Sequence, residues 1–501
     1  MHCDAMYVKG KDCLDTNLAA YASCFYNVCT LNTRMCQPTR LDFVLRLAAI
    51  VLFAFLSLPC SAASAPCRIE VVEKDTGWPV PLVELTTTHH VRFVTDNAGL
   101  IAFDLPELMG RETWFTINGQ GYEVPQDDFG NRGVHFVPES GKTNRIEVQR
   151  TIIARRLGRL TGGGLFAEGQ KLGQFNDWHE SGILGSDTVQ TAIYHSKLFW
   201  LWGDTVIPSY PLGIFDSSSA TTPVKPLSKF EPPLQVLFNY FNDDKGRPRG
   251  VAPVPGKGPT WITGYLSLPD ASGKEHLVGT YLKIRNHLDV YQVGLVAWDD
   301  QRETFETFRV LWNQSEANPK PGLFLDGHPA QWTDPAGKKW VLFGNPFPTV
   351  RCPATFEAWG NTNTWEPLKH PDKLLAATTG ETVKLHSGSI AWNPWRKRWV
   401  TVFMQAEGKP SYLGELWYAE ADSPMGPWGR AVKILSHNRY TFYNPRLHPE
   451  FTSDNSPILI FEGTYTMEFS GNSNPTPRYD YNQILYRLDL DDPRLKPAQE
   501  P

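Results

Sequence analysis

Short runs of aromatic and β-branched residues, separated by polar turns, recur from residue 186 almost to the end of the chain. The first unit runs from Ser186 to Thr205 and reads SDTVQTAIYHSKLFWLWGDT. Two such runs joined by a polar turn, here at His195, predict a β-hairpin. Antiparallel pairing brings the start of one strand beside the end of the next. Asp187 and Asp204 are therefore expected on the same rim of one sheet.

Comparable units follow this hairpin at intervals of roughly 60–75 residues, which is longer than compact propeller blades but compatible with looped ones. The second and fourth units each read as four strands, with no helical pattern between them. The units open at Asp187, Trp261, Asp326, His386 and Asn444. Repeated four-stranded units without intervening helices predict an all-β chain with a five-bladed β-propeller over 181–492.

The composition of the 501-residue chain narrows the classes of function. The formal net charge is −5 and there are no runs of Lys and Arg, which argues against nucleic acid as a partner. Gly and Pro, at 40 residues each, favour many turns over long helices. Only Cys67 and Cys352 follow residue 60, so the mature chain is not a disulfide scaffold. A bridge between these two cysteines and two separate thiols both remain open.

Residues 1–65 are expected to be a leader that ends in a secretory signal peptide. Two arginines precede an apolar segment at 47–58, and small residues follow it at 61–65. This order is typical of a signal peptide, and the apolar core is shorter than the ~20 residues of a membrane span. The true start is expected at Met35, with a real extended leader as the alternative. The mature protein is expected to be secreted, periplasmic or on the cell surface, with membrane contact only through the signal segment.

Residues 66–150 alternate as short strands at spacings of about 8–12 residues, which predicts a small antiparallel β-sandwich. The stretch resembles the prealbumin-like regulatory modules found beside carboxypeptidases and in many exported enzymes. The matching pieces are Thr76-Gly77 with Pro79-Val80-Pro81, Thr95-Asp96 with Gly99, and Gly121-Tyr122. The resemblance implies a module that stabilises or positions its neighbour. The arginine-containing stretch 151–180 is expected to be a linker.

Residues 180–490 resemble the five-bladed propeller glycoside hydrolases of the arabinanase and xylosidase clan, and the related endo-D-arabinanase family. The resemblance rests on the Ser-Asp…Trp-Gly-Asp-Thr form of the first unit and on Ala419–Trp428, which is similar to the SDSPxGPW strand end of that clan. There, an Asp opening the first blade is the general base, an Asp of the third tunes the acid, and a Glu opening the fourth is the acid. Asp187 and Asp326 match the first two by position. His386 stands where the Glu is expected, so the proton donor would be Glu462, Glu415 or Asp204 instead.

Acidic residues at one end of the propeller axis are expected to carry the chemistry, because crowded carboxylates raise one another's pKa and can divide acid and base roles. The candidate catalytic residues are Asp187, Asp204, Asp326, Glu415 and Glu462. The candidate substrate-binding residues are Trp202, Trp261, Arg285, His328, His386, Asp480, Tyr481 and Asn482. Turn formation by the aspartates and packing of the tryptophans between blades are the structural alternatives. We assign no metal and expect no cofactor, although the clan sometimes carries Ca²⁺ on its axis.

The sequence leaves two functions open. The first is an exported glycoside hydrolase that acts on a polysaccharide or oligosaccharide by acid/base catalysis with axial carboxylates. The second is a non-catalytic β-propeller of the cell surface that binds glycan or protein. His386 in place of the expected Glu favours the second function, whereas the number of other acids on the rim favours the first.

Overall fold

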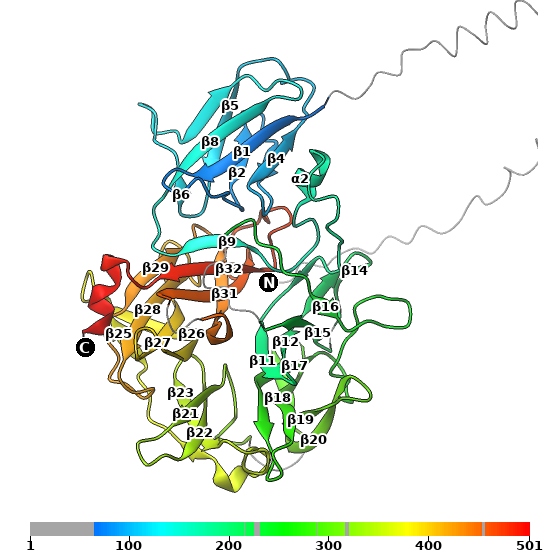
Figure 1. Ribbon diagram of the computed structural model, residues 1–501, viewed down its shortest axis with the longest axis vertical. Helices are drawn as coiled ribbons and strands as arrows, with labels where there is room; N and C mark the ends of the chain where they lie inside the picture. The colour runs from blue at the N-terminus through cyan, green and yellow to red at the C-terminus, as the bar shows by residue number, and fades with distance from the viewer. Residues whose placement is uncertain are drawn as a thin grey trace, which may run out of the picture. The chain divides into compact units, whose positions relative to one another are not determined.

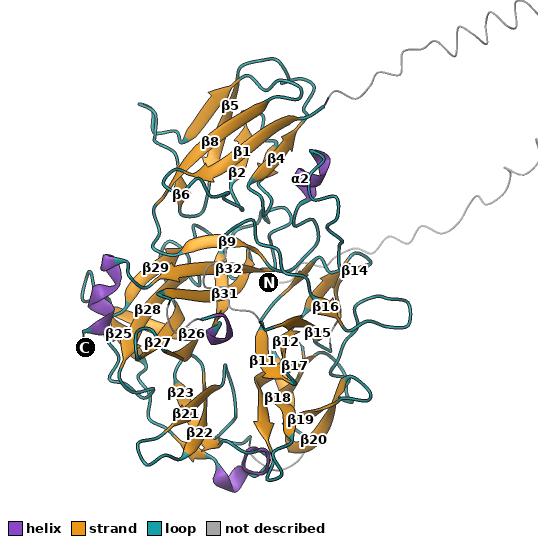
Figure 2. Ribbon diagram, viewed as in Figure 1, coloured by secondary structure: helices purple, strands orange, loops and turns teal. Residues whose placement is uncertain are grey.

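The computed structural model describes residues 65–214, 216–224, 231–286, 288–315, 320–452 and 456–500. The signal peptide and the Met35 start expected within residues 1–65 lie outside these ranges, apart from residue 65 itself. Strands predominate in the described ranges, and the helices are short (Figure 2). None of the described helices has the length and apolar character needed to span a membrane.

The first eight strands form two four-stranded sheets, ordered β4-β1-β8-β6 and β3-β2-β5-β7. Their bounds are β1 Cys67–Glu73, β2 Glu84–Thr87, β3 Arg92–Val94, β4 Leu100–Phe103, β5 Thr113–Asn118, β6 Tyr122–Glu123, β7 Gly133–Phe136 and β8 Thr143–Arg150. Side chains from both sheets, among them Ile69, Leu85 and Phe115, share one buried core. This is the β-sandwich expected from the sequence. It is not wholly antiparallel, because β1 and β8 run parallel.

Five further sheets form the blades of a β-propeller (Figure 1). The first blade contains β11 Gln190–Tyr194, β12 Lys197–Trp202, β15 Ser218–Pro223 and β16 Asn239–Tyr240. The second contains β17 Thr260–Pro269, β18 Glu275–Arg285, β19 Asp289–Asp299 and β20 Thr304–Asn313. The third contains β21 Ala330–Thr333, β22 Lys339–Gly344, β23 Pro348–Pro353 and β24 Glu366–Pro367.

The last two blades are less regular. The fourth has five strands, β25 Lys373–Leu375, β26 Thr382–Asn393, β27 Arg398–Gln405, β28 Glu415–Ala421 and β29 Val432–Ser436. The fifth contains β30 Thr441–Leu447, β31 Ile458–Thr466, β32 Asn482–Asp489 and β9 Arg155–Arg159. A small additional sheet contains β10 Gly185–Ser186, β13 Thr205–Ile207 and β14 Tyr210–Ile214. The described helices are α2 Ala167–Lys171, α3 Phe356–Trp359, η1 Thr362–Thr364, η2 Pro449–Phe451 and η3 Pro493–Gln499.

The hairpin predicted between residues 186 and 205 is present. Strands β11 and β12 pair in register from Gln190 opposite Leu201 to Tyr194 opposite Lys197. The two turn residues between them both have positive φ angles, 47° and 61°. Two consecutive positive φ angles are typical of the tight turn whose twist matches the flanking strands.

The outermost strand of the fifth blade comes from before the rest of the propeller in the sequence. Strand β9 pairs antiparallel with β32, from Arg159 opposite Ile484 to Arg155 opposite Arg487. The expected linker 151–180 therefore includes a strand of the propeller. An extended arginine-containing segment looks like a connector in the sequence, because its pairing partner lies more than 300 residues away.

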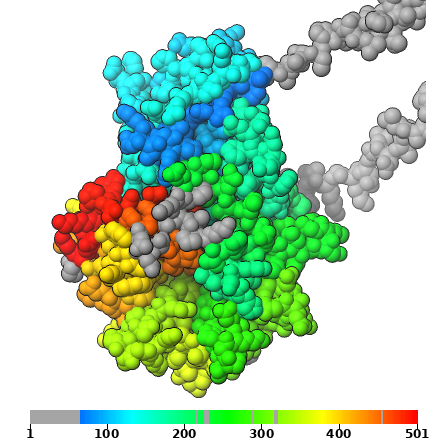
Figure 3. All heavy atoms as spheres, in the orientation of Figure 1, coloured from blue at the N-terminus to red at the C-terminus, as the bar shows by residue number. Residues whose placement is uncertain are grey.

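The sandwich covers the free edge of β9. The side-chain amide of Asn97 donates to the Arg159 carbonyl at 2.8 Å and accepts from the Arg159 N–H at 2.9 Å. The guanidinium of Arg156 donates to main-chain carbonyls of the sandwich, including that of Gly119 at 2.6 Å. One apolar core is continuous from β1 to the fourth and fifth blades, and Figure 3 shows the blue and cyan atoms of the sandwich directly against the propeller. An edge covered in this way cannot template pairing with another chain.

The two cysteines beyond residue 60 are separate thiols. Cys67 lies in the core that includes the sandwich, and Cys352 lies in the core of the third blade. Both are buried and free. Of the two alternatives left open by the sequence, the structure has the one without a bridge.

We expect Leu157→Ala to destabilise the described part of the chain as a whole. Leu157 in β9 is fully buried among residues of the first and fifth blades. Removing its side chain leaves a cavity where β9 completes the fifth blade. This cavity should lower the free energy of unfolding by about 2–5 kcal/mol. Urea unfolding followed by tryptophan fluorescence measures this change. Leu237→Ala is the matched control, because Leu237 is 70% exposed. Equal effects of the two substitutions would contradict the role given to β9.

Candidate active site

Asp187 and Asp204 lie opposite each other where the first hairpin ends. The Asp187 N–H donates to the Asp204 carbonyl at 3.1 Å, and the Gly203 N–H donates to the Asp187 carbonyl at 3.0 Å. Strands β10 and β13 continue this pairing, with Ser186 opposite Thr205. The acid pair thus occupies one rim of the sheet, as the hairpin pattern predicts.

Aromatic side chains from other blades hold both carboxylates. The Tyr443 hydroxyl of the fifth blade donates to Asp187 Oδ2 at 2.7 Å. The indole Nε1 of Trp261, in the second blade, donates to Asp204 Oδ1 at 3.0 Å. A Cβ on Gly203 would lie 2.4 Å from Asp187 Oδ1, so the Asp187 carboxylate rests directly against this glycine. The Asp187 carboxylate is thus held from two sides, and the Asp204 carboxylate is held by the Trp261 indole.

The environment of Asp187 favours its neutral form. Burial, followed by the charge of Asp204, raises the pKa of Asp187 from 3.8 to about 7. Hydrogen bonds from Tyr443 and Tyr481 oppose this rise, because they stabilise the carboxylate. Burial also raises the pKa of Asp204, against the hydrogen bond from Trp261. A carboxyl group with a pKa near neutrality is suited to proton transfer at physiological pH.

Two further carboxylates adjoin this pair from the loop between β31 and β32. Asp480 Oδ1 accepts from the Met467 N–H at 2.7 Å. Partial desolvation and the charges of Asp480 and then Asp204 raise the pKa of Glu468. Burial raises the pKa of Asp480. Glu468 was not among the residues predicted from the sequence, although it follows the end of β31 by two residues and so lies on the same rim as Asp480.

A ring of contacts between neighbouring blades surrounds this end of the axis. It consists of Trp261 with Asp204, Thr263 with Asp326 at 2.7 Å, the Gly388 N–H with Asn345 at 2.7 Å, the Asn444 N–H with Ser387 at 3.3 Å, and Tyr443 with Asp187. Every blade therefore bonds to both of its neighbours. The ring includes four of the five predicted unit openings, and the fifth, His386, is the exposed neighbour of Ser387.

Glu462 and Glu415, two of the three candidate proton donors, have partners elsewhere in the fold. Glu462 is fully buried and contacts His448 Nε2 at 2.7 Å. Glu415 is also fully buried and contacts the Lys433 ammonium at 2.7 Å. Asp187, Asp204, Glu468 and Asp480 together form the acid cluster. The structure places Glu462 and Glu415 in ion pairs outside this cluster. Only the fold shows which cation lies beside each of these carboxylates.

The ion pair of Glu462 belongs to a charge network inside the fifth blade. His448 also contacts Glu450 at 2.8 Å, and Arg446 lies 3.6 Å from the same carboxylate. Burial alone would raise the pKa of Glu450, but Arg446 and His448 hold it at about 2. Burial opposes protonation of His448, but Glu450 and Glu462 raise its pKa overall. Two cationic side chains thus face two carboxylates, so these charges are compensated within the blade and stabilise the fold.

Three predicted substrate-binding residues are also internal. Trp202 is 1% exposed and stacks on Trp200, so it packs in the core. Asn482 is fully buried, where it accepts from the Thr161 hydroxyl at 2.9 Å. His328 is 6% exposed, and burial holds its pKa well below the usual value. Trp202 ends β12, Asn482 begins β32 and His328 precedes β21, but the sequence does not show the direction of a side chain.

The other predicted residues lie near the surface. Asp480 is one of the clustered acids, and Tyr481 and Trp261 donate hydrogen bonds to Asp187 and Asp204. Asp326 accepts from Thr263 in the interblade ring. Arg285 is partly exposed and pairs with Asp289 at 2.9 Å within the second blade. Its guanidinium is thus bound within its own blade. In the described ranges, no group of three or more His, Cys, Asp or Glu side chains is placed to hold a metal ion.

Comparisons with known proteins add the following. No protein-family model matches the chain, and no curated protein matches it. Similar solved structures include an exo-1,5-α-L-arabinanase from a bovine ruminal metagenomic library, at 9% identity and TM-score 0.36, covering 62% of this chain and 94% of that one. The native arabinanase of Bacillus subtilis is similar at 11% identity and TM-score 0.32, covering 61% and 96%. An N-acetylgalactosamine deacetylase from F. plautii is similar at 11% identity and TM-score 0.35, covering 63% and 95%.

Two substitutions should move the pKa of Asp187 in opposite directions. Tyr443→Phe removes a hydrogen bond to the carboxylate, so the pKa should rise above about 7. Asp204→Asn removes a neighbouring negative charge, so the pKa should fall. NMR titration of protein labelled with ¹³C at the aspartate carboxyl groups measures both shifts. Shifts of the same sign would contradict the proposed balance of burial, charge and hydrogen bonding.

Asp187 should also make the protein less stable as the pH rises. Its pKa is 3.8 when unperturbed and about 7 in the fold, so the folded chain binds more protons between these values. Stability should therefore fall between about pH 4 and pH 7 and change little from this group beyond that range. Asp187→Asn should flatten the profile, as measured by urea unfolding across this interval. Asp422→Asn, at an 87% exposed position, should leave it unchanged.

Proposed function

We propose that the chain is a glycoside hydrolase that acts on a polysaccharide or oligosaccharide through the carboxylates at one end of the propeller axis. The observation that carries this proposal is the Asp187–Asp204 pair, in which burial and mutual repulsion raise the pKa of Asp187 to about 7. Hydrolysis of a glycosidic bond requires one carboxyl group to donate a proton and another to act as base or nucleophile. The two members of this pair have different environments, which separates these roles.

In the proposed mechanism, Asp187 is the proton donor. Its neutral carboxyl protonates the glycosidic oxygen as the bond to the sugar carbon breaks. Asp204, held by Trp261, is the carboxylate that assists attack on the sugar, either through a water molecule or directly. Tyr443 and Tyr481 then stabilise the charge left on Asp187. Asp187 was expected as the base, and its raised pKa is the reason for the reversed assignment.

Phe469 is the side chain best placed to contact a sugar ring. It is 62% exposed, follows Glu468 directly, and packs edge-on against Tyr443. Its φ angle of 59° is uncommon for a bulky residue and holds the ring in an otherwise unfavoured position. Aromatic rings bury the apolar face of a sugar. Phe469 would thus form the wall of a subsite beside the acid pair.

A carbohydrate-binding propeller without catalytic activity is the second candidate. It is favoured by His386 at the position expected for the acid, and by the internal ion pairs that bind Glu415 and Glu462. With either function we propose an exported protein, since polymeric glycans lie outside the cell. This part of the proposal rests on the signal-peptide pattern of the leader.

Release of reducing sugar from plant, algal and bacterial polysaccharides tests the proposal. Asp187→Asn and Asp204→Asn should each lower the rate by about 10²–10⁴-fold, the usual effect of removing a general acid or base. Both variants should keep their affinity for the substrate. Asp422→Asn is the control, because its carboxylate is almost fully exposed and contacts Arg398.

Two outcomes would contradict hydrolysis at this site. Full activity in both active-site variants would show that hydrolysis occurs at a site other than Asp187 and Asp204. Glycan binding without cleavage by the unsubstituted chain, over the whole panel, would identify the protein as the binding propeller.

A further inference from the structure

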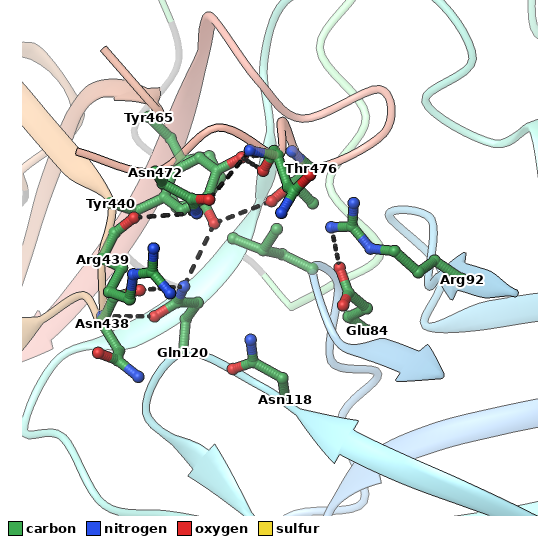
Figure 4. A pocket seen from close by; sticks show the side chains of 12 residues that line it. Glu84, Arg92, Asn118, Gln120, Asn438, Arg439, Tyr440, Tyr465, Asn472 and Thr476 are labelled. Carbon is green, nitrogen blue, oxygen red and sulfur yellow. Dashed lines mark hydrogen bonds and ion pairs between the residues drawn. The ribbon is translucent and has the colours of Figure 1, made fainter. Parts of the chain in front are cut away.

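A polar cavity of about 430 Å³ lies between the sandwich and the fifth blade (Figure 4). None of the four clustered acids lines it. The sandwich lines it with Glu84, Arg92, Asn118 and Gln120. The opposite wall comes from the segment before β30 and from the loop between β31 and β32. Pockets that bind ligands are often formed where two modules meet.

Internal hydrogen bonds make the walls of this cavity rigid. The Gln120 amide donates to the Asn438 carbonyl at 3.2 Å and accepts from the Asn438 N–H at 2.7 Å. The Tyr440 hydroxyl donates to the Asn474 carbonyl at 3.3 Å, and its ring stacks on that of Tyr465 at 4.2 Å. A site whose walls are already ordered loses little conformational entropy on binding.

Several polar groups nonetheless remain free to bind a ligand. Within the described ranges, the side-chain amides of Asn118, Asn438 and Asn474 have no hydrogen-bond partner, and all three residues are exposed. The guanidinium of Arg439 is likewise unpaired and exposed in this part of the chain. Arg92, in contrast, is neutralised by its ion pair with Glu84. The cavity therefore offers three amides and one uncompensated positive charge.

We propose that this cavity binds an acidic oligosaccharide, in which hydroxyl groups alternate with carboxylates. An amide both donates and accepts, which suits sugar hydroxyls, and a guanidinium pairs with a carboxylate in a bidentate manner. Apart from the buried tyrosine rings, Leu82 is the sole apolar side chain in the lining, so the site lacks the apolar subsites that anchor a peptide. A nucleic acid would require several unpaired cations along its path.

The occupant of this cavity would sit beside the loop that carries half of the acid cluster. The loop between β31 and β32 lines the cavity with Asn472, Asn474 and Thr476. Its two ends carry Glu468 and Asp480. The proposal goes beyond hydrolysis, since binding here uses none of the axial carboxylates.

Binding to short oligogalacturonates and oligomannuronates, measured by isothermal titration calorimetry, tests the inference. The mature chain carrying Asp187→Asn is used as the parent, so that no cleavage disturbs the titration. Arg439→Gln and Asn118→Ala should each weaken binding by about tenfold or more, as expected when a hydrogen bond to a charged or polar ligand group is lost. Added salt should weaken binding to the parent and have less effect on the Arg439→Gln variant.

Arg111→Gln is the matched control. Arg111 is an exposed arginine of the sandwich, its side chain has no partner among the described residues, and it lies seven residues from Asn118, across the length of β5. Its substitution should leave the affinity unchanged. The proposal is overturned if the parent binds no acidic oligosaccharide, if the cavity variants bind as tightly as the parent, or if neutral arabino- and xylo-oligosaccharides bind equally well. Selective binding of a peptide would identify a different class of partner and would also overturn it.

Discussion

The pairing of β9 with β32 is the contact on which the rest of the arrangement depends. A propeller closes when its last blade is completed, and here the completing strand precedes the other propeller strands in the sequence. The same strand is bonded on its outer edge by Asn97 of the sandwich. Closure of the propeller and docking of the sandwich therefore share one strand. The cavity proposed as a glycan site lies at this junction, so its walls are set by the same closure.

Closure also explains why an acid cluster can exist on the axis. The five contacts of the interblade ring bring polar atoms of neighbouring blades within hydrogen-bond distance at this end of the axis. The desolvation that raises the pKa of Asp187 costs free energy, and the ring together with the blade cores supplies the opposing stability. Functional carboxylates of this kind are tolerated because the surrounding scaffold holds them. The charge network of Arg446, His448, Glu450 and Glu462 is different, because there each charge has a partner of opposite sign.

Much of the fold was predictable because strand patterns are local. Alternating and aromatic runs located the first hairpin, the four strands of the second blade and the small sandwich, and turn residues separated them. The position of Asp187 opposite Asp204 followed from hairpin geometry alone. Less of the site was predictable. Glu462 and Asn482 were expected to contact substrate, yet they bond His448 and Thr161 inside the molecule. Glu468 was overlooked because its position after β31 becomes meaningful only when Asp480 and Asp204 are beside it.

The sequence by itself determined the class of fold, the number of blades and the pairing of the first two acids, because hydrophobic periodicity and turn chemistry act over a few residues. The tertiary structure alone decided which acids are neutralised by ion pairs and which are available for chemistry. Charge, burial and hydrogen bonding depend on residues brought together from distant parts of the chain, such as Tyr443 at Asp187 and Lys433 at Glu415. It also decided that residues 155–159 complete the last blade, since strand pairing over such a separation leaves no local mark in the sequence.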